Sequence, residues 1–272
     1  DSRAVLQRER HGTLLMDVER PLQLTLRSLW RQEAHLVPYP VDEAHAQVLP
    51  HLEADGEHGG LRLPEVLDAL QGQSALARYR AMLAHLAAHR EFSQPLVADN
   101  WSPLQRMAVE CFEDARVDGL LLRRYPGLTP VFKALHPQPQ EGGVNLAQRN
   151  GLRQRPTLRS RALVFAGEPG ADAQRALYRA RFQTELAGAA TSSTRAMAAL
   201  ALDWAAQTRV ASDQFADVAF EDTHIDWRDD NRHLWIYIEA GDEESSFDQR
   251  READHAEDAG LPPRLYPEWD AA

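Results

Sequence analysis

Two histidines four residues apart are the clearest chemical signal in this chain. They stand in the segment His85-Leu86-Ala87-Ala88-His89, and residues at i and i+4 share one face of a helix. Two imidazoles in this arrangement can bind one metal ion, as in the His-Glu-x-x-His helix of zinc proteases. In those proteases the glutamate after the first histidine is the general base, and Leu86 stands in its place here. The spacing therefore offers two ligands without a base.

A catalytic zinc site also needs a third protein ligand. Glu113 or Asp114, in the next predicted helix, would have to supply it. One alternative for this chain is therefore a degenerate helical metallohydrolase that uses His85, His89 and Glu113. Because the base is replaced by leucine and no spacing fixes a third ligand, we instead expect that these residues hold no metal and that the chain carries no cofactor.

Acidic residues surround one arginine in the helix that follows. The group consists of Glu110, Glu113, Asp114, Arg116 and Asp118. Glu113 and Arg116 are i,i+3 neighbours, and the planar guanidinium of an arginine can bind two carboxylates. Paired carboxylates can also act as acid and base, but that chemistry needs a pocket and shifted pKa values. We therefore predict a structural ion network centred on Arg116.

Motifs for nucleophilic or nucleotide chemistry are missing from the sequence. Cys111 is the only cysteine and falls on the apolar stripe of its predicted helix, which indicates an inert core thiol. There is no Gly-x-Ser-x-Gly, and the run Gly167-Glu168-Pro169-Gly170 lacks the Gly-Lys-Ser/Thr of a phosphate-binding loop. We expect no catalytic residue in this chain and no ATP binding by the chain alone.

The charge of the chain is negative and uneven. Its 272 residues carry 30 basic and 41 acidic side chains, a net charge of −11, and eight acids face two arginines between Gly241 and Gly260. This balance disfavours a nucleic-acid partner. No apolar run is long enough to span a membrane, and the start at Asp1-Ser2-Arg3 does not resemble a signal peptide. With a single cysteine, these features predict a cytoplasmic protein without a membrane partner.

Helices must position most of these residues. The histidines fall in a predicted helix from Ser74 to Phe92, and the acidic group falls in a helix from Ser102-Pro103, a cap followed by a first-turn proline, to Arg124. Apolar residues at helical spacing predict four more helices, near residues 22–30, 129–136, 178–186 and 197–211, and Pro64 is expected to open a brief helix over residues 65–70.

The pattern changes towards the end of the chain. Two β-rich runs, residues 223–227 and 234–238, flank a polar turn, which predicts a β-hairpin that packs on the helices. The acidic segment beyond Ala240 is typical of a disordered linker. We therefore predict a mainly α fold, with a helical domain over residues 1–240 that includes the hairpin and an acidic linker over residues 241–272.

Several segments, taken in order, resemble the CbbO/NorD family. The helix Glu113-Asp114-Ala115-Arg116-Val117-Asp118 is also similar to one in a cobaltochelatase subunit of the same domain plan. The resemblance is dense between Leu61 and Pro137, and the closing strip looks like the segment before that family's von Willebrand A domain. The segments that carry it are Leu61–Val66, Tyr79–His85, Glu91–Phe92, Phe112–Asp118, Arg124–Leu128, Ala134–Pro137 and Tyr266–Asp270.

The resemblance implies a non-catalytic adaptor of a hexameric MoxR-type AAA+ ATPase. In the CbbO branch the complex reactivates Rubisco by releasing inhibitory sugar phosphates, and in the NorD branch it helps to mature nitric oxide reductase. The local sequence around His136-Pro137 is more similar to the Rubisco branch. The family's von Willebrand A domain carries a metal-binding Asp-x-Ser-x-Ser, which does not occur here. The chain therefore looks like the portion before that domain, with Rubisco as a client bound through the absent domain.

Overall fold

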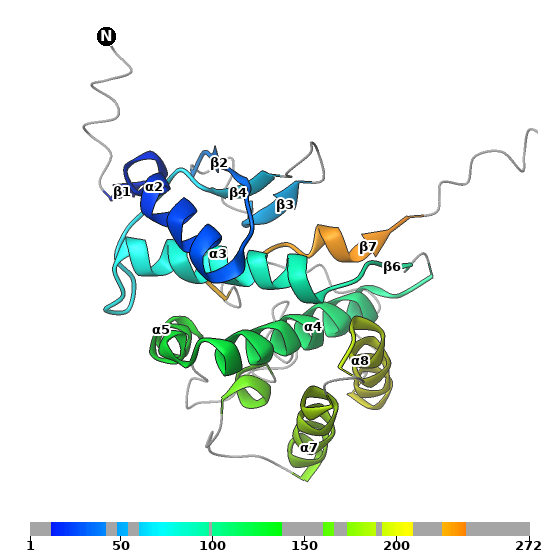
Figure 1. Cartoon of the computed structure of the whole chain (residues 1–272). Coiled ribbons are helices and arrows are strands. Elements are labelled where there is room, and N and C mark those ends of the chain that lie inside the picture. The colour runs from blue at the N-terminus through cyan, green and yellow to red at the C-terminus, as the bar shows by residue number, and fades with distance from the viewer. Residues whose placement is uncertain are drawn as a thin grey trace, which may run out of the picture. The chain divides into compact units, whose positions relative to one another are not determined.

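The computed structural model describes residues 12–41, 48–53, 60–97, 100–137, 160–165, 173–188, 192–208 and 225–237 (Figure 1). The chain divides into two units, Asp1–Ile236 and Tyr237–Ala272, and every element named below lies in the first. The described residues are mainly helical with a small β component, which confirms the predicted fold class.

The helices and strands are short, apart from two long helices near the middle of the sequence. The helices are α2 (Leu15–Thr25), η1 (Leu26–Trp30), α3 (Ala75–Phe92), α4 (Pro103–Arg124), η3 (Pro126–Leu128), α5 (Thr129–Leu135), α7 (Ala173–Ala187), α8 (Thr194–Thr208) and η5 (Arg232–Leu234). The strands are β1 (Thr13–Leu14), β2 (His35–Tyr39), β3 (His51–Glu53), β4 (Gly60–Pro64), β5 (Val66–Leu67), β6 (Leu96–Val97) and β7 (Trp235–Ile236).

Helices α3 and α4 begin where their sequence signals place them. The Ser74 hydroxyl caps α3 by accepting the amide of Ala77. Ser102 and Gln105 form a reciprocal capping box at the start of α4, with Pro103 in its first turn. Every residue of α3 from 81 to 89 is buried, so this helix is covered on all sides.

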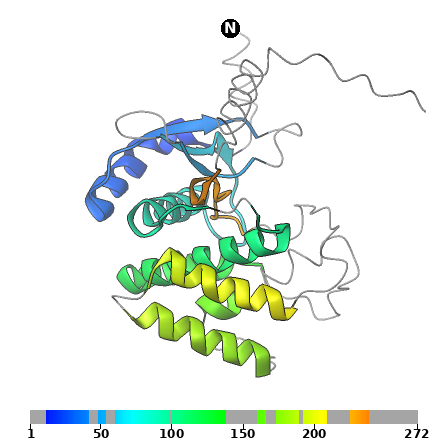
Figure 2. The same cartoon turned by 90° about the vertical axis from the view of Figure 1, so that its right-hand side faces the viewer.

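The chain is layered around these two helices. Figures 1 and 2 show α3 and α4 across the middle, with α2 and strands β2, β3 and β4 on the side of α3 away from α4, and with α7 and α8 against α4. One apolar core joins α2, the strands, α3 and α5, and includes Tyr79 and Trp227. A second core joins α4 to α7 and α8, and includes Phe112, Phe182 and Trp204. The interface of α3 and α4 thus lies deep inside the unit.

A three-stranded sheet in the order β2-β4-β3 packs against α3 through β4 and was not predicted from the sequence. The brief helix expected over residues 65–70 is wrong, because Val66–Leu67 pair with β1 as strand β5. Strand β4 is central, parallel to β2 and antiparallel to β3. The Tyr79 hydroxyl of α3 donates a buried hydrogen bond of 2.9 Å to the Pro64 carbonyl at the end of β4. The strands are too short for a clear alternating pattern, and β2 contains Pro38, which suggests a break.

The described residues of the predicted hairpin, 225–237, take a different conformation. Strand β7 pairs with β6 in parallel, with Trp235 opposite Leu96, and residues 226–231 form turns and irregular backbone. Residues 225–229 are all buried, whereas a strand of a two-stranded hairpin would bury alternate residues. Burial of Trp227 against Phe132 and ion pairing of its neighbours account for the difference. The small β element is present, but it is not that hairpin.

Several sequence predictions concern residues outside the described part of the chain. These are the Gly167–Gly170 run, the acidic linker over 241–272 and the Tyr266–Asp270 strip. No helix among the described residues is both long and apolar enough to cross a membrane.

Candidate metal centre

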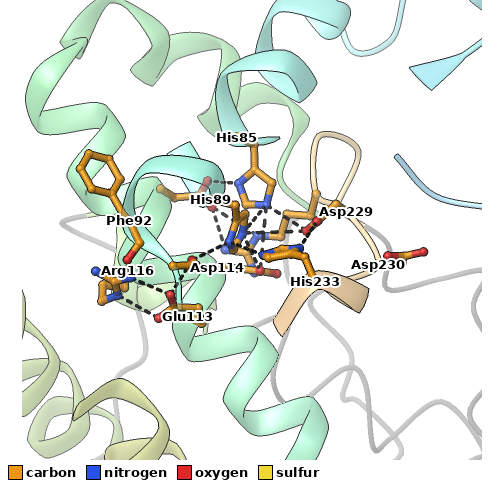
Figure 3. Close-up of polar contacts among 12 residues, drawn as sticks. His85, His89, Phe92, Glu113, Asp114, Arg116, Asp229, Asp230 and His233 are labelled. Atoms are coloured by element: carbon orange, nitrogen blue, oxygen red, sulfur yellow. Dashed lines mark hydrogen bonds and ion pairs between the residues drawn. The ribbon is translucent and has the colours of Figure 1, made fainter. Parts of the chain in front are cut away.

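Two pairs of polar side chains, one pair from each helix, face each other across the interface of α3 and α4. His85 and His89 stand one turn apart on α3, and Asp114 and Asp118 stand one turn apart on α4. The segment 225–237 closes the third side and brings Asp229 against them (Figure 3). Side-chain exposure is 7% for Asp114 and 0% for the other four, so the group is shielded from solvent.

Four of these side chains direct one ligand atom each to a common point. The Nε2 atoms of His85 and His89 are 3.1 Å apart. The Asp114 Oδ1 atom lies 3.9 Å from the first and 3.3 Å from the second. The Asp229 Oδ1 atom lies 3.6 and 3.8 Å from the same two nitrogens. All four atoms fall within 4.8 Å of one another, so His85, His89, Asp114 and Asp229 are the described residues that could hold a metal ion.

The orientation of His85 is fixed by Asp118. The Nδ1 atom of His85 lies 2.9 Å from Asp118 Oδ1, and this oxygen also accepts the indole N–H of Trp227. The other oxygen, Oδ2, accepts two N–H groups of Arg228 at 2.8 and 3.2 Å. An ionised carboxylate only accepts hydrogen bonds, so Nδ1 of His85 carries the proton that it donates to Asp118. In a neutral ring this leaves the Nε2 lone pair facing the common point.

A second relay orients His89. Its Nδ1 atom lies 2.8 Å from the Ser93 hydroxyl, which itself donates to Glu113 Oε1 at 2.6 Å. Because the hydroxyl proton goes to Glu113, the Ser93 oxygen accepts from the Nδ1–H of His89. The same Nδ1 also lies 3.1 Å from Nε2 of His233. The Nε2 lone pair of a neutral His89 then faces that of His85.

The carboxylates at the centre are left with buried atoms that have no hydrogen bond. Among the described residues, Asp114 Oδ1 and both oxygens of Asp229 have no hydrogen-bond partner. The Asp114 Oδ2 atom has a charged neighbour, Arg228, at 3.4 Å, and His233 Nδ1 lies 3.1 Å from Asp229 Oδ2. A buried polar atom without a partner is costly, and metal coordination is one way to satisfy it.

The electrostatics of the centre favour ionised carboxylates. Burial alone would raise the pKa of Asp118, but Arg228 and His85 outweigh it and hold that pKa at about 2. Burial likewise opposes ionisation of Asp229, yet His89 and His233 hold its pKa well below the usual range. Burial lowers the pKa of His85, but Asp118, Asp229 and Asp114 outweigh burial and raise it to about 10. Burial lowers the pKa of His89. A cation, whether a proton on His85 or a metal ion, is therefore stabilised here.

Glu113, the ligand named for the metallohydrolase alternative, is directed elsewhere. Its two oxygens bind Arg116 at 2.6 and 2.8 Å, and Oε1 also accepts the hydroxyls of Ser93 and Thr194. Its neighbour Asp114 takes the position at the histidines, because successive helical residues point about 100° apart. Glu113 thus acts on His89 through Ser93.

The predicted network around Arg116 divides into separate groups. Arg116 binds Glu113 and the Phe92 carbonyl, and both side chains are buried. Asp114 and Asp118 pair with Arg228 instead. Glu110 accepts the indole N–H of Trp235 at 2.9 Å. Of the predicted group, Arg116 and Glu113 form one buried ion pair, and a second arginine, Arg228, pairs with Asp114 and Asp118.

Asp229 and Arg228 are the residues that sequence reasoning missed. They belong to the Arg228–Arg232 run, which the sequence predicts to be the polar turn of a hairpin. The one sequence feature that points to these residues is the cluster of charged side chains between Trp227 and Trp235. Such a cluster is also typical of a solvent-exposed turn, so it does not by itself indicate a buried site. Cys111 is buried on α4, as expected for a core thiol.

Comparison with family models, with curated proteins and with solved structures found no match for this chain.

Proposed function

We propose that this chain is a non-catalytic adaptor that docks a hexameric MoxR-type AAA+ ATPase and couples it to a client. The resemblance of its ordered segments to the CbbO/NorD family carries the proposal. Rubisco, reactivated by release of inhibitory sugar phosphates, is the favoured client, and maturation of nitric oxide reductase is the alternative. The proposal places the chain in the cytoplasm, without a nucleic-acid or membrane partner.

The contacts among the resembling segments support a shared scaffold. Strand β4 from the first segment accepts the Tyr79 hydroxyl of the second at Pro64. His85 of the second segment binds Asp118 of the fourth. Arg124 and Glu91 pair across two further segments at 2.7 Å. Residues that carry the resemblance thus contact one another and stabilise one scaffold. This supports a family that shares this scaffold and binds its partners through other surfaces.

The second candidate function is a metal-dependent hydrolase built on His85 and His89. Their position beside Asp114 and Asp229 favours metal binding, but it does not favour hydrolysis. Four protein ligands fill a tetrahedral zinc sphere, whereas a catalytic zinc keeps one position for water or substrate. The cavities lined by described residues near Gln23 and near Ala180 include none of the four.

Gel filtration of the full chain with candidate MoxR-type hexamers tests the adaptor role, with an unrelated AAA+ ring as control. We expect co-elution with one MoxR-type ring only. Because Asp-x-Ser-x-Ser is absent from the sequence, the chain should not restore the activity of inhibited Rubisco in the presence of ATP and that ring. Failure to bind any MoxR-type ring, or Rubisco reactivation by the chain and ring alone, would show this division of roles to be wrong.

A further inference from the structure

The strongest unexplained feature of the molecule is a set of buried electron pairs that face one another. The hydrogen bonds to Asp118 and Ser93 occupy the Nδ1 protons of His85 and His89, so two Nε2 atoms meet 3.1 Å apart without a donor between neutral rings. Two carboxylate oxygens, from Asp114 and Asp229, join them without a hydrogen bond. Four acceptors around one point repel one another unless a cation lies among them.

We propose that His85 Nε2, His89 Nε2, Asp114 Oδ1 and Asp229 Oδ1 bind one first-row divalent metal ion, and that the ion is Zn²⁺. This assignment replaces the expectation from sequence that the two histidines hold no metal. It adds the ligands that the sequence could not fix, Asp114 from α4 and Asp229 from the segment 225–237. It does not depend on the adaptor role proposed above.

The distances fit a tetrahedral ion. Zinc bonds of about 2.0–2.2 Å to nitrogen and oxygen place neighbouring tetrahedral ligands about 3.3–3.6 Å apart. The five ligand separations given above run from 3.1 to 3.9 Å around this value. Two imidazoles with two carboxylates are also donors that suit zinc better than calcium or magnesium, which prefer six or more oxygens.

The charge of the centre matches a divalent ion. Three aspartates, at positions 114, 118 and 229, face one arginine, Arg228, and the neighbouring pairs Glu113–Arg116 and Arg78–Asp226 are each neutral in themselves. With neutral histidines the buried group therefore carries a charge of −2. One divalent ion brings the sum to zero, which a buried site requires.

Outer contacts of the type found in metalloproteins surround the four ligands. Each histidine donates its Nδ1–H to an oxygen atom, that of the Asp118 carboxylate for His85 and that of the Ser93 hydroxyl for His89. Arg228 contacts the free oxygen of Asp114, at 3.4 Å. Such partners fix the tautomer and orientation of metal ligands.

The proposed ion is a structural clasp. Its ligands come from α3, α4 and the segment 225–237, and the last of these has little regular structure of its own. Four protein ligands close the coordination sphere, as in structural zinc sites. The ion therefore fastens Asp229, and with it the buried Trp227, onto the two central helices.

Metal analysis of the untagged full chain tests the site. After removal of metals by a chelator and titration with Zn²⁺, we expect one bound equivalent by mass spectrometry of the metal. Asp229→Asn should bind at least about 100-fold more weakly, since loss of even an outer partner costs about 10–100-fold. Asp230→Asn is the matched control and should bind like the natural chain, because Asp230 lies apart from the cluster and pairs with Arg232 (Figure 3).

Cobalt provides a test that needs no variant to fold. Co²⁺ added to the metal-free natural chain should give the strong visible absorption of tetrahedral coordination, saturate at one equivalent and be displaced by Zn²⁺. Absence of metal binding by the natural chain would show that the four side chains do not form a metal site and would overturn the proposal. Equal affinity of Asp229→Asn and the natural chain, or an octahedral Co²⁺ spectrum, would overturn it as well.

Discussion

The Nδ1 atom of His85 and the Oδ1 atom of Asp118 form a fully buried hydrogen bond of 2.9 Å between α3 and α4. The same carboxylate binds Arg228, 110 residues further along the chain. Asp118 thus joins the two central helices to the segment 225–237, and its geometry sets which nitrogen of His85 faces Asp114 and Asp229. Stability and the proposed metal site therefore share the same contacts.

Removal of Arg116 should strongly destabilise the fold. Arg116→Ala leaves the buried Glu113 carboxylate without its guanidinium partner, and loss of one member of a buried pair costs about 3–5 kcal/mol. Thermal unfolding should show a melting temperature lower by on the order of 10 °C. In the control Arg181→Ala, the lost partner is the exposed Asp203, and the melting temperature should stay close to that of the natural chain. Equal melting temperatures for all three chains would contradict a structural role for Arg116.

Ser93 should tune the metal affinity without being a ligand. Ser93→Ala removes the acceptor that holds the Nδ1–H of His89 and separates the ring from Glu113. We expect the Zn²⁺ affinity, measured by competition with a chelating dye, to fall about 10–100-fold while one equivalent still binds. Ser74→Ala at the other end of α3 is the control. It should lose about 1 kcal/mol of stability as a missing cap and leave the affinity unchanged. Equal affinities of the two variants would argue against the relay.

His136 should make the protein sensitive to mild acid. Burial lowers the pKa of His136 to about 3; Arg228 and Arg161 add to this, while the Pro137 carbonyl and Asp118 oppose it. The folded state therefore keeps the ring neutral, and the unfolded chain takes up a proton below about pH 6.5. This contribution to stability is complete above pH 6.5 and is lost progressively as the pH falls towards 3, by about 1.4 kcal/mol per pH unit at most.

Denaturant unfolding between pH 7.5 and pH 4 measures this slope. His136→Gln removes the titrating group, so its free energy of unfolding should fall less steeply with acid than that of the natural chain. The absolute stability of the variant does not enter the comparison, because only the slopes are compared. Parallel curves for the two chains would show that His136 does not cause the loss.

Local signals account for the parts of this structure that the sequence predicted. Ser74 and Ser102 cap helices that begin at the next residue, and Arg124 ends the second one as expected. The histidine pair and Asp114 were within reach for the same reason, since helical spacing relates residues close in sequence. Strands β2, β3 and β4 are short and depend on pairing with one another, and Pro38 within β2 is a residue that usually breaks a strand. Asp229 lies far from α3 and α4 in sequence, so only the folded chain brings it to His85 and His89.

Hydrogen exchange should reveal how far the proposed ion holds the segment 225–237. Without the ion the centre retains three aspartates and one arginine at close range, and mutual repulsion of the carboxylates should release the residue that is least anchored, Asp229. We expect amides of residues 225–237 to exchange at least about tenfold faster in the metal-free chain, because saturation at 100 times the dissociation constant stabilises the bound form by about 2.7 kcal/mol. Helix α8, which packs in the second core, should show no comparable change. Faster exchange spread evenly over α8 and the segment would indicate that the ion supports the whole domain, and unchanged exchange in the segment would contradict the clasp.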